Sequence, residues 1–502
     1  MISSSSMTCR PRATAALIAA ALVLGLAGCG EEIEDTPPRP PVAGGAVLAR
    51  LLADADAAMA RGALPDAARM LDEARSLAPE SPDLWVAIAR LRLRGGEHLT
   101  ALEAADRALA FGPDHAPALL LRAQMVRDAH GPLDALRWFA AARKAAPDNP
   151  DILAEYAATL GDAGRAGAML KMVRVLAEVA PDDPRVPWLQ AVLAARGGEY
   201  GLARSLLERS GMAQREVPAA LLLDALISLE EGNADSAAAT LETLSARQPA
   251  NARVRELLAR ALFEGGREDA LIARFGPEAA LPEASPYLVM LVARAHERRG
   301  DRATAAPLLA RAYGAMRAGP VVLAVRDGLP VPTAETRAAL LAGNRDGART
   351  GAEALRQRFP ASADVASLAG DAFMGAGDAQ AALTAYGLAA EARRPWPLAR
   401  KTIAAFQRSG RGEVADLLLI RQMAGDPQTT SAAFALAERL AAGGDWAGAA
   451  ALLDHAIRLG AGHDPALLRL RLRAAQALED KPGEARFAAV LAEVQPRALS
   501  PR

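Results

Sequence analysis

The residues of this 502-residue chain that are best suited to chemistry are its six histidines and two cysteines. His455 and His463 have the most metal-like surroundings, because Asp454 and Asp464 lie beside them and imidazole and carboxylate groups are common zinc ligands. These four residues straddle a predicted turn, where surface histidines explain them better. The sequence contains no Gly-rich phosphate loop ending in Lys-Ser/Thr, no G-x-S-x-G elbow and no H-E-x-x-H pair. It therefore predicts no catalytic residue, no metal site, no cofactor and no enzymatic activity.

The two cysteines, Cys9 and Cys29, flank an apolar stretch near the N-terminus. Arg10 and Arg12 precede the apolar residues Ala13 to Leu26. A basic segment followed by a short apolar run is the layout of a secretory signal peptide, and this run is too short to span a membrane comfortably. Removal of a signal peptide over residues 1–28 would leave Cys29 as the single cysteine of the mature protein, so we expect no disulfide.

The segment Leu26-Ala27-Gly28-Cys29 resembles the lipobox of bacterial lipoproteins. The resemblance implies that the Cys29 thiol accepts a diacylglycerol and that Cys29 becomes the new N-terminus. The alternative is an ordinary signal peptide that happens to end near a cysteine. Residues 29–45 are acidic and Pro-rich, and we expect an extended tether there. Gly30 follows the cysteine, which by resemblance to the sorting pattern of many Gram-negative lipoproteins favours a periplasm-facing, outer-membrane location.

The rest of the sequence must be built from an element that repeats. Five prolines recur on a 34-residue spacing that misses one position, at Arg215: Pro79, Pro113, Pro147, Pro181 and Pro249. Seventeen residues before these positions lies a glycine or a close substitute: Gly62, Gly96, His130 followed by Gly131, Gly164, Gly198 and Gly232. Alanines recur between them at Ala67, Ala101, Ala135, Ala203 and Ala237. The glycine favours a tight turn, the alanine a close helix contact and the proline a helix end, which together indicate stacked helical hairpins.

These positions resemble the tetratricopeptide (TPR) repeat over about nine-tenths of the sequence. Trp85 and Phe139 hold large apolar positions of the motif, and the segments Gly377 to Pro395 and Gly443 to Gly460 are among the closest matches. The resemblance implies an all-α, right-handed TPR solenoid of about 12–13 helical hairpins.

The repeat loses its spacing once. In the second half the spacing starts again at Pro360, and Pro427 follows one residue short of two 34-residue periods later. The change of register corresponds to about nine extra residues, which fall within Ala318 to Thr333. We therefore predict an N-terminal TPR array over residues 46–318, a hinge or insertion over residues 319–333, and a C-terminal TPR array over residues 334–497. The alternative for the insertion is a degenerate hairpin with lengthened turns.

In TPR proteins the first helix of each hairpin lines a concave groove. By this resemblance we expect the following residues to lie there: Arg90, Arg94, Arg127, Trp188, Arg196, Arg260, Arg294 and Arg298. Arginine suits two-point capture of carboxylates, so the groove would bind an acidic peptide, the C-terminus of a partner protein or an anionic polysaccharide. The alternative is a solvated face in an Arg-rich protein. Trp188 is either a groove anchor or a packing residue.

The formal net charge of −1 gives no pull toward nucleic acid. The TPR and lipobox resemblances together imply a membrane-anchored scaffold that binds envelope proteins or peptide segments. In layout it most resembles the TPR lipoproteins of exopolysaccharide-linked PEP-CTERM systems, which favours exopolysaccharide export over pilus or outer-membrane assembly. The alternatives are a glycan- or peptidoglycan-binding groove and, third, an enzyme subunit or regulator. Five tryptophans and five tyrosines offer few platforms for sugar rings.

Overall fold

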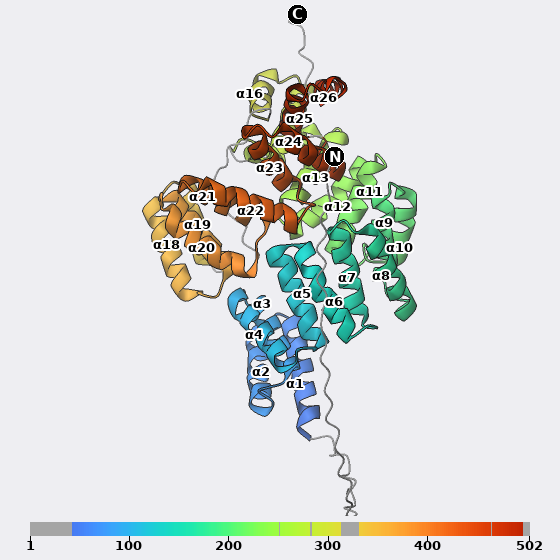
Figure 1. Cartoon of the computed structure of the whole chain (residues 1–502), viewed down its shortest axis with the longest axis vertical. Helices are drawn as coiled ribbons and strands as arrows, with labels where there is room; N and C mark the ends of the chain where they lie inside the picture. Colours follow the sequence, from blue (N-terminus) through green and yellow to red (C-terminus); the bar gives the residue numbers. More distant parts are fainter. Residues whose placement is uncertain (1–42, 250, 282–283, 313–330, 463, 495–502) are drawn as a thin grey trace, which may run out of the picture. The chain divides into compact units, whose positions relative to one another are not determined.

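The structure is a computed structural model that describes residues 43–249, 251–281, 284–312, 331–462 and 464–494. The predicted signal peptide, Cys29, most of the tether and residues 319–330 of the predicted hinge lie outside these residues. Over the described ranges the protein forms helices and turns with no strand, and consecutive helices pair as hairpins (Figure 1). Thirteen such pairs confirm the predicted all-α TPR solenoid.

The first eight hairpins precede the predicted insertion. Their helices are α1 (Ala43–Ala60), α2 (Leu64–Leu77), α3 (Pro82–Arg94), α4 (His98–Phe111), α5 (Ala116–His130), α6 (Pro132–Ala145), α7 (Pro150–Asp162), α8 (Ala166–Val179), α9 (Arg185–Arg196), α10 (Tyr200–Ser210), α11 (Pro218–Glu230), α12 (Ala234–Arg247), α13 (Ala252–Glu264), α14 (Glu268–Ala279), α15 (Pro286–Arg298) and α16 (Arg302–Ala312).

The last five hairpins follow it. Their helices are α17 (Val331–Leu341), α18 (Arg345–Arg358), α19 (Ala363–Gly375), α20 (Ala379–Ala392), α21 (Trp396–Arg408), α22 (Gly412–Gly425), α23 (Thr430–Ala442), α24 (Trp446–Ala456), α25 (Pro465–Ala477) and α26 (Lys481–Val494), with a short π-helical turn, Ile457–Ala461, after α24.

The recurring glycines sit in the turns inside the hairpins and have left-handed backbones. Their φ angles are +76° at Gly62, +77° at Gly96, +93° at Gly131, +74° at Gly164, +81° at Gly198 and +80° at Gly232. An L-residue with a Cβ is strained in this region, which is why the turn selects glycine. The five prolines on the 34-residue spacing each lie two residues beyond the end of a second helix, as at Pro79 after α2 and Pro147 after α6. The missed position at Arg215 follows a shorter second helix, α10.

Four first helices, α3, α7, α15 and α25, begin with both a capping side chain and a proline. Ser81 and Asn149 accept hydrogen bonds from backbone N–H groups at the starts of α3 and α7, and Pro82 and Pro150 occupy the first helical position. A proline there costs no hydrogen bond, since the first N–H groups of a helix have no partner inside it.

Small residues separate the helices of a hairpin. The predicted alanines at 67, 101, 135, 203 and 237 are all fully buried, as are Ala74, Ala108 and Ala142 about two turns further along three of these helices. Alanine at these places lets the backbones of the two helices approach closely, so each hairpin buries only a thin apolar layer. The outer surface of each hairpin packs against the next hairpin of the array.

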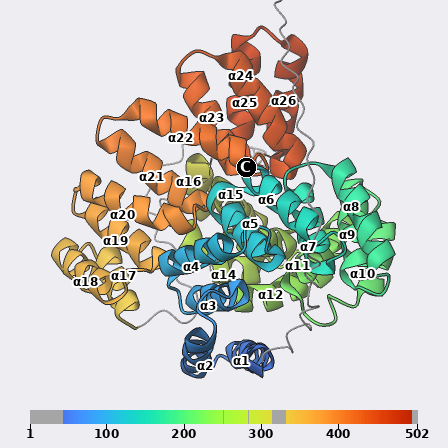
Figure 2. The same cartoon turned by 60° about the horizontal axis from the view of Figure 1, so that its bottom comes forward.

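The first eight hairpins and the last five, which we call the N-terminal and C-terminal arrays, also touch each other through the ends of hairpins. Helix α20 packs against α4 and α5, α22 against α6, and α25 against α15; all of these helices are labelled in Figure 2. Leu99 donates its backbone N–H to the Ala361 carbonyl at 3.2 Å, and Ala363 donates to Nδ1 of His98 at 3.2 Å. Arg394 donates its backbone N–H to the Asp128 carbonyl at 3.1 Å.

The C-terminal array contains a buried ion pair. Lys401 Nζ lies 2.5 Å from Asp371 Oδ2, and the Tyr386 hydroxyl donates to Asp371 Oδ1 at 2.8 Å. The side chains of Lys401 and Asp371 are 3% and 1% exposed. Burial raises the pKa of Tyr386, and the adjacent Asp371 carboxylate raises it further. Removing one partner from such a pair costs about 3–5 kcal/mol, because the other charge is left buried alone. Asp371, Tyr386 and Lys401 thus link α19, α20 and α21.

Gly370 and Gly387, both inside helices of the tenth hairpin, give opposite predictions for the same substitution. A Cβ at Gly370 would overlap the buried ring of Tyr386, whereas a Cβ at Gly387 meets nothing within 4 Å. Gly370→Ala should lower the free energy of unfolding by about 1–3 kcal/mol. Gly387→Ala should raise it by about 0.5–1 kcal/mol, because alanine is the better helix former. Thermal melting of the two variants beside wild type tests both; equal melting temperatures for the pair would contradict the contact.

Candidate functional site

Four of the predicted groove arginines form ion pairs between successive first helices. Each guanidinium reaches an acid of the neighbouring hairpin, so the charges lie along the array as a ladder. The pairs are Arg90–Asp56 at 3.9 Å, Arg127–Glu155 at 2.8 Å, Arg196–Asp162 at 3.8 Å and Arg260–Glu230 at 3.3 Å. Much of the positive charge that the sequence assigns to ligand capture is thus balanced within the protein.

The other predicted arginines follow the same trend with one exception. Arg294 pairs with Glu297 at 3.3 Å, and Arg298 pairs with Glu268 at 3.0 Å. Arg94 is exposed and forms no ion pair with any residue that the structure describes. The predicted set therefore lies spread over α3, α5, α9, α13 and α15 and does not converge on one point.

Trp188 lies in the packing between hairpins. Its indole is half-buried and contacts both the apolar cluster of α7 and α8 and the cluster of α10 and α11. Its Nε1 atom is buried without a hydrogen-bond partner among the described residues. This placement favours the packing role over the groove anchor.

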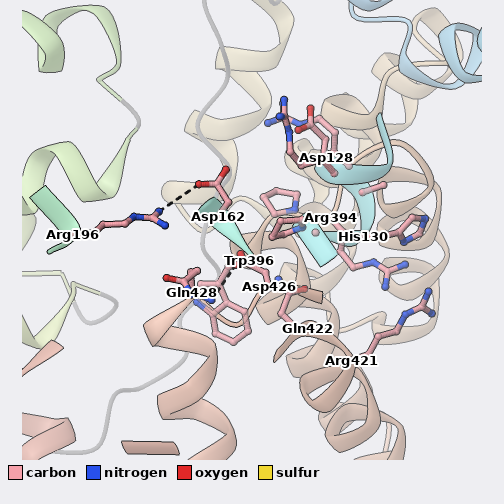
Figure 3. Close-up of a pocket in the computed structure, with 16 residues that line it drawn as sticks. Asp128, His130, Asp162, Arg196, Arg394, Trp396, Arg421, Gln422, Asp426 and Gln428 are labelled. Atoms are coloured by element: carbon pink, nitrogen blue, oxygen red, sulfur yellow. Dashed lines mark hydrogen bonds and ion pairs between the residues drawn. The ribbon is translucent and has the colours of Figure 1, made fainter. Parts of the chain in front are cut away.

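Functional groups converge instead at a cleft of about 490 Å³ where the two arrays meet. We call it the cross-array cleft. One wall is the turn from α5 to α6 with the ends of α7 and α9, and the other is the loop from α20 to α21 with the end of α22 and the loop after it (Figure 3). Its charged and aromatic lining residues are Arg127, Asp128, His130, Asp162, Arg196, Arg393, Arg394, Trp396, Arg421 and Asp426.

The walls of the cleft are held in backbone contact. A Cβ at Gly131 would overlap the Gly425 carbonyl, and a Cβ at Gly425 would overlap the His130 carbonyl. Only residues that lack a Cβ allow this approach. The Arg394 backbone bond to Asp128 joins the same two walls.

Three arginines of the C-terminal wall have no acidic partner. Arg393 and Arg394 are half-buried and Arg421 is exposed, and none of them forms an ion pair within the part of the protein that the structure describes. Burial lowers the pKa of Arg394, and Arg421 lowers it further because the two positive charges repel. The positive charges on this wall therefore repel one another, and a bound anion would reduce that repulsion.

His130 belongs to the opposite wall, and its side chain lies near Arg394 and Arg421 (Figure 3). Burial lowers its pKa, and the positive charges of Arg394, Arg421 and Arg122 add to the effect, against a smaller opposite effect of Asp134. Its Nδ1 atom is buried and has no hydrogen-bond partner among the described residues. The pKa of His130 therefore depends on the charges of the cleft.

The sequence predicts only Arg127 and Arg196 among these lining residues. It marks His130 as a turn position and gives no role to Arg394 or Arg421. The repeat register relates each hairpin to the next one, whereas this cleft joins the third, fourth and fifth hairpins to the eleventh hairpin and the loops on either side of it. The run Arg393-Arg394 just before Pro395 is the one local sign of it.

The metal candidate of the sequence does not assemble in the described residues. His455 Nε2 lies 2.7 Å from the Pro427 carbonyl, and Asp454 pairs with Arg471 at 2.8 Å. His463 lies outside the described residues. Within those ranges no three His, Cys, Asp or Glu residues are grouped to hold a metal ion. No described helix has the length and apolar character needed to cross a membrane.

Asp464 lies at a contact of the two arrays, at the start of α25. Its carboxylate caps the helix by accepting from the N–H groups of Ala466 at 2.8 Å and Leu467 at 3.2 Å. Burial nevertheless raises the pKa of Asp464 to about 6, with a smaller contribution from Glu256 of α13. Burial also raises the pKa of Glu438 of α23, helped by Asp464.

Comparison with known proteins identifies the repeat. The tetratricopeptide-repeat family model matches residues 52–116 and 222–275. No curated protein matches this sequence. Residues 52–116 and 222–275 therefore carry TPR sequence, and TPR repeats form scaffolds for protein–protein interaction.

Several solved structures resemble parts of the array. Pseudomonas aeruginosa PilF is 18% identical with a TM-score of 0.35, and the match covers 43% of this protein and 99% of PilF. PilW, described as a widely conserved type IV pilus biogenesis factor, is 23% identical with a TM-score of 0.34, over 39% of this protein and 94% of PilW. Yeast Tom70 is 14% identical with a TM-score of 0.31, over 89% of this protein and 99% of Tom70. At these TM-scores the likenesses carry no argument about function.

The raised pKa of Asp464 predicts a pH dependence of stability. An unfolded aspartate titrates near pH 4, so between about pH 4 and 6 the folded protein holds a proton that the unfolded protein has lost. Stability should fall as pH rises through this window. Asp464→Asn keeps the helix cap and removes the charge, so it should raise the free energy of unfolding at pH 7 by about 1–3 kcal/mol and flatten the dependence.

Melting temperatures of wild type and variant from about pH 4.5 to 7.5 test this window. Asp445→Asn is the matched control, because Asp445 also caps a helix, α24, but is exposed. An unchanged pH slope in Asp464→Asn would contradict the prediction.

Proposed function

We propose that this protein is a non-enzymatic scaffold, anchored to a membrane through an acylated Cys29, that binds protein partners of a bacterial envelope machine. The observation that carries the proposal is the extent of the array. From Ala43 to Val494 the described residues consist of helical hairpins and their turns. An array of this kind offers a long surface for partners.

The anchor rests on the N-terminal sequence. A basic segment, a short apolar run and the Leu26-Ala27-Gly28-Cys29 motif stand in the order that lipoprotein processing requires. Two or more acyl groups at Cys29 give stable membrane attachment, whereas a single one is marginal. Residues 30–42 would then lead from the membrane to α1. Gly30 after the cysteine favours the outer membrane, with the array in the periplasm.

Among envelope machines we place exopolysaccharide export first and pilus or outer-membrane assembly next. The support is the layout alone, a lipidated cysteine followed by a long TPR array. The identity of the captured partner distinguishes the three machines.

The two cysteines provide a matched test of the anchor. Cys29→Ala should move the protein from the membrane fraction to the soluble periplasmic fraction and abolish its labelling by a radioactive fatty acid. Cys9→Ala, within the segment to be removed, should leave both unchanged. Continued membrane association and labelling of Cys29→Ala would refute the lipid anchor.

The scaffold function needs a separate measurement. Cross-linking of the wild-type protein in cells, followed by mass spectrometry, should repeatedly recover the same envelope proteins, each at a constant molar ratio to this protein. Recovery of no such protein would overturn the scaffold function whatever the result for Cys29.

A further inference from the structure

We propose that the cross-array cleft is a binding site for a carboxylate-bearing peptide, either the C-terminus or an acidic segment of a partner protein. The inference rests on the proposed scaffold function, since it names the chemistry by which that scaffold would recognise a partner. The site differs from the predicted groove, because it lies where hairpin ends of the two arrays meet.

The charges of the cleft are out of balance. Arg127 and Arg196 on one wall are paired with Glu155 and Asp162. On the other wall, Arg393, Arg394 and Arg421 have no acidic partner among the described residues, and the acids of the lining are fewer than its arginines. Unpaired guanidinium groups close to one another repel, and a carboxylate between Arg394 and Arg421 would accept charge-assisted hydrogen bonds from both.

The groups around these cations suit the other parts of a peptide. The amides of Gln422 and Gln428 line the cleft, and each offers both a donor and an acceptor, as peptide backbone requires. Trp396 adds an apolar surface for a neighbouring residue of the peptide. Asp128 and Asp426 can accept from peptide N–H groups. A volume of about 490 Å³ lies within the usual range of ligand sites, roughly 300–1,000 Å³.

The same lining favours a peptide over an acidic polysaccharide. Sugar rings need aromatic platforms. Trp396 is the single Trp, Tyr or Phe among the described lining residues, and it is half-buried.

A peptide bound here would strengthen the contact between the arrays. Its carboxylate would lie against Arg394 and Arg421 of the C-terminal array, while its remaining groups would reach the turn at Asp128 and His130 of the N-terminal array. Partner binding and array contact would then be thermodynamically linked, each favouring the other.

The test uses two synthetic probes and the full-length protein in detergent. One probe is a dye-labelled pentapeptide, Gly-Leu-Gly-Glu-Glu, with a free C-terminal carboxylate. The other is its neutral twin, Gly-Leu-Gly-Gln-Gln with an amidated C-terminus. By fluorescence anisotropy, wild type should bind the acidic probe at least about tenfold more tightly than the neutral one. Arg394→Gln and Arg421→Gln should each weaken binding of the acidic probe about tenfold, one charge-assisted contact being removed.

Arg137→Gln is the matched control, since Arg137 is exposed on α6 and does not line the cleft. It makes the same change of charge and should leave binding unchanged. Equal binding of the two probes, or unaltered binding in Arg394→Gln and Arg421→Gln, would overturn the proposal. Tighter binding of hexagalacturonate than of the acidic peptide would overturn it in favour of a glycan site.

A second readout reports on the site itself. In the NMR spectrum of protein labelled with ¹³C at histidine, the acidic probe should raise the pKa of His130, because its carboxylate offsets the charges of Arg394 and Arg421. The His130 resonance is assigned from its loss in His130→Gln. The neutral probe should leave that pKa in place, and a shift of equal size with either probe would refute the site.

Failure of this site is distinguishable from failure of the scaffold function. If wild type cross-links to an envelope protein in cells and Arg394→Gln with Arg421→Gln cross-links equally well, the cleft proposal fails and the scaffold stands. If the acidic probe binds as expected but no partner is recovered, the scaffold proposal fails and the cleft stands.

Discussion

The close approach of paired helices is the constraint on which this structure depends. Two helices lie side by side at short distance only where the facing residues are small, and the fully buried alanines at 67, 101, 135, 203 and 237 meet this condition in one hairpin after another. A hairpin built this way buries a thin layer, so it needs its neighbours on both sides. The glycines in the left-handed turns and the prolines after the second helices keep each hairpin at the length that stacking requires.

The sequence predicts this local order well because its causes are local. A positive φ at Gly62 or Gly232 depends on a few neighbouring residues, and the helix end before Pro79 depends on fewer still. The second helix before the missed position at Arg215, α10, ends instead at Gly211, whose backbone is left-handed. The repeat spacing therefore predicts the fold class and a number of hairpins, about 12–13, that agrees with the thirteen described.

Residue spacing fails where the environment is set by distant hairpins. Arg127 and Arg260 are correctly assigned to first helices, but their acidic neighbours, Glu155 and Glu230, decide that their charge is balanced. Arg394 and Arg421 line one cleft together with His130 of the other array. No periodic pattern in the sequence connects these residues. The buried Asp371–Lys401 pair is a third case, since neither residue type is expected in an apolar layer.

The contacts between the two arrays have a consequence for how the protein folds. Each hairpin closes over a few residues and can form as soon as it is synthesised, whereas the bond from Ala363 to His98 joins residues 265 apart. Ordering so long a loop carries an entropy cost that only the finished C-terminal hairpins can offset. The first array should therefore complete itself while the second is still being made, and the junction that holds Arg394 beside His130 should form last and open first.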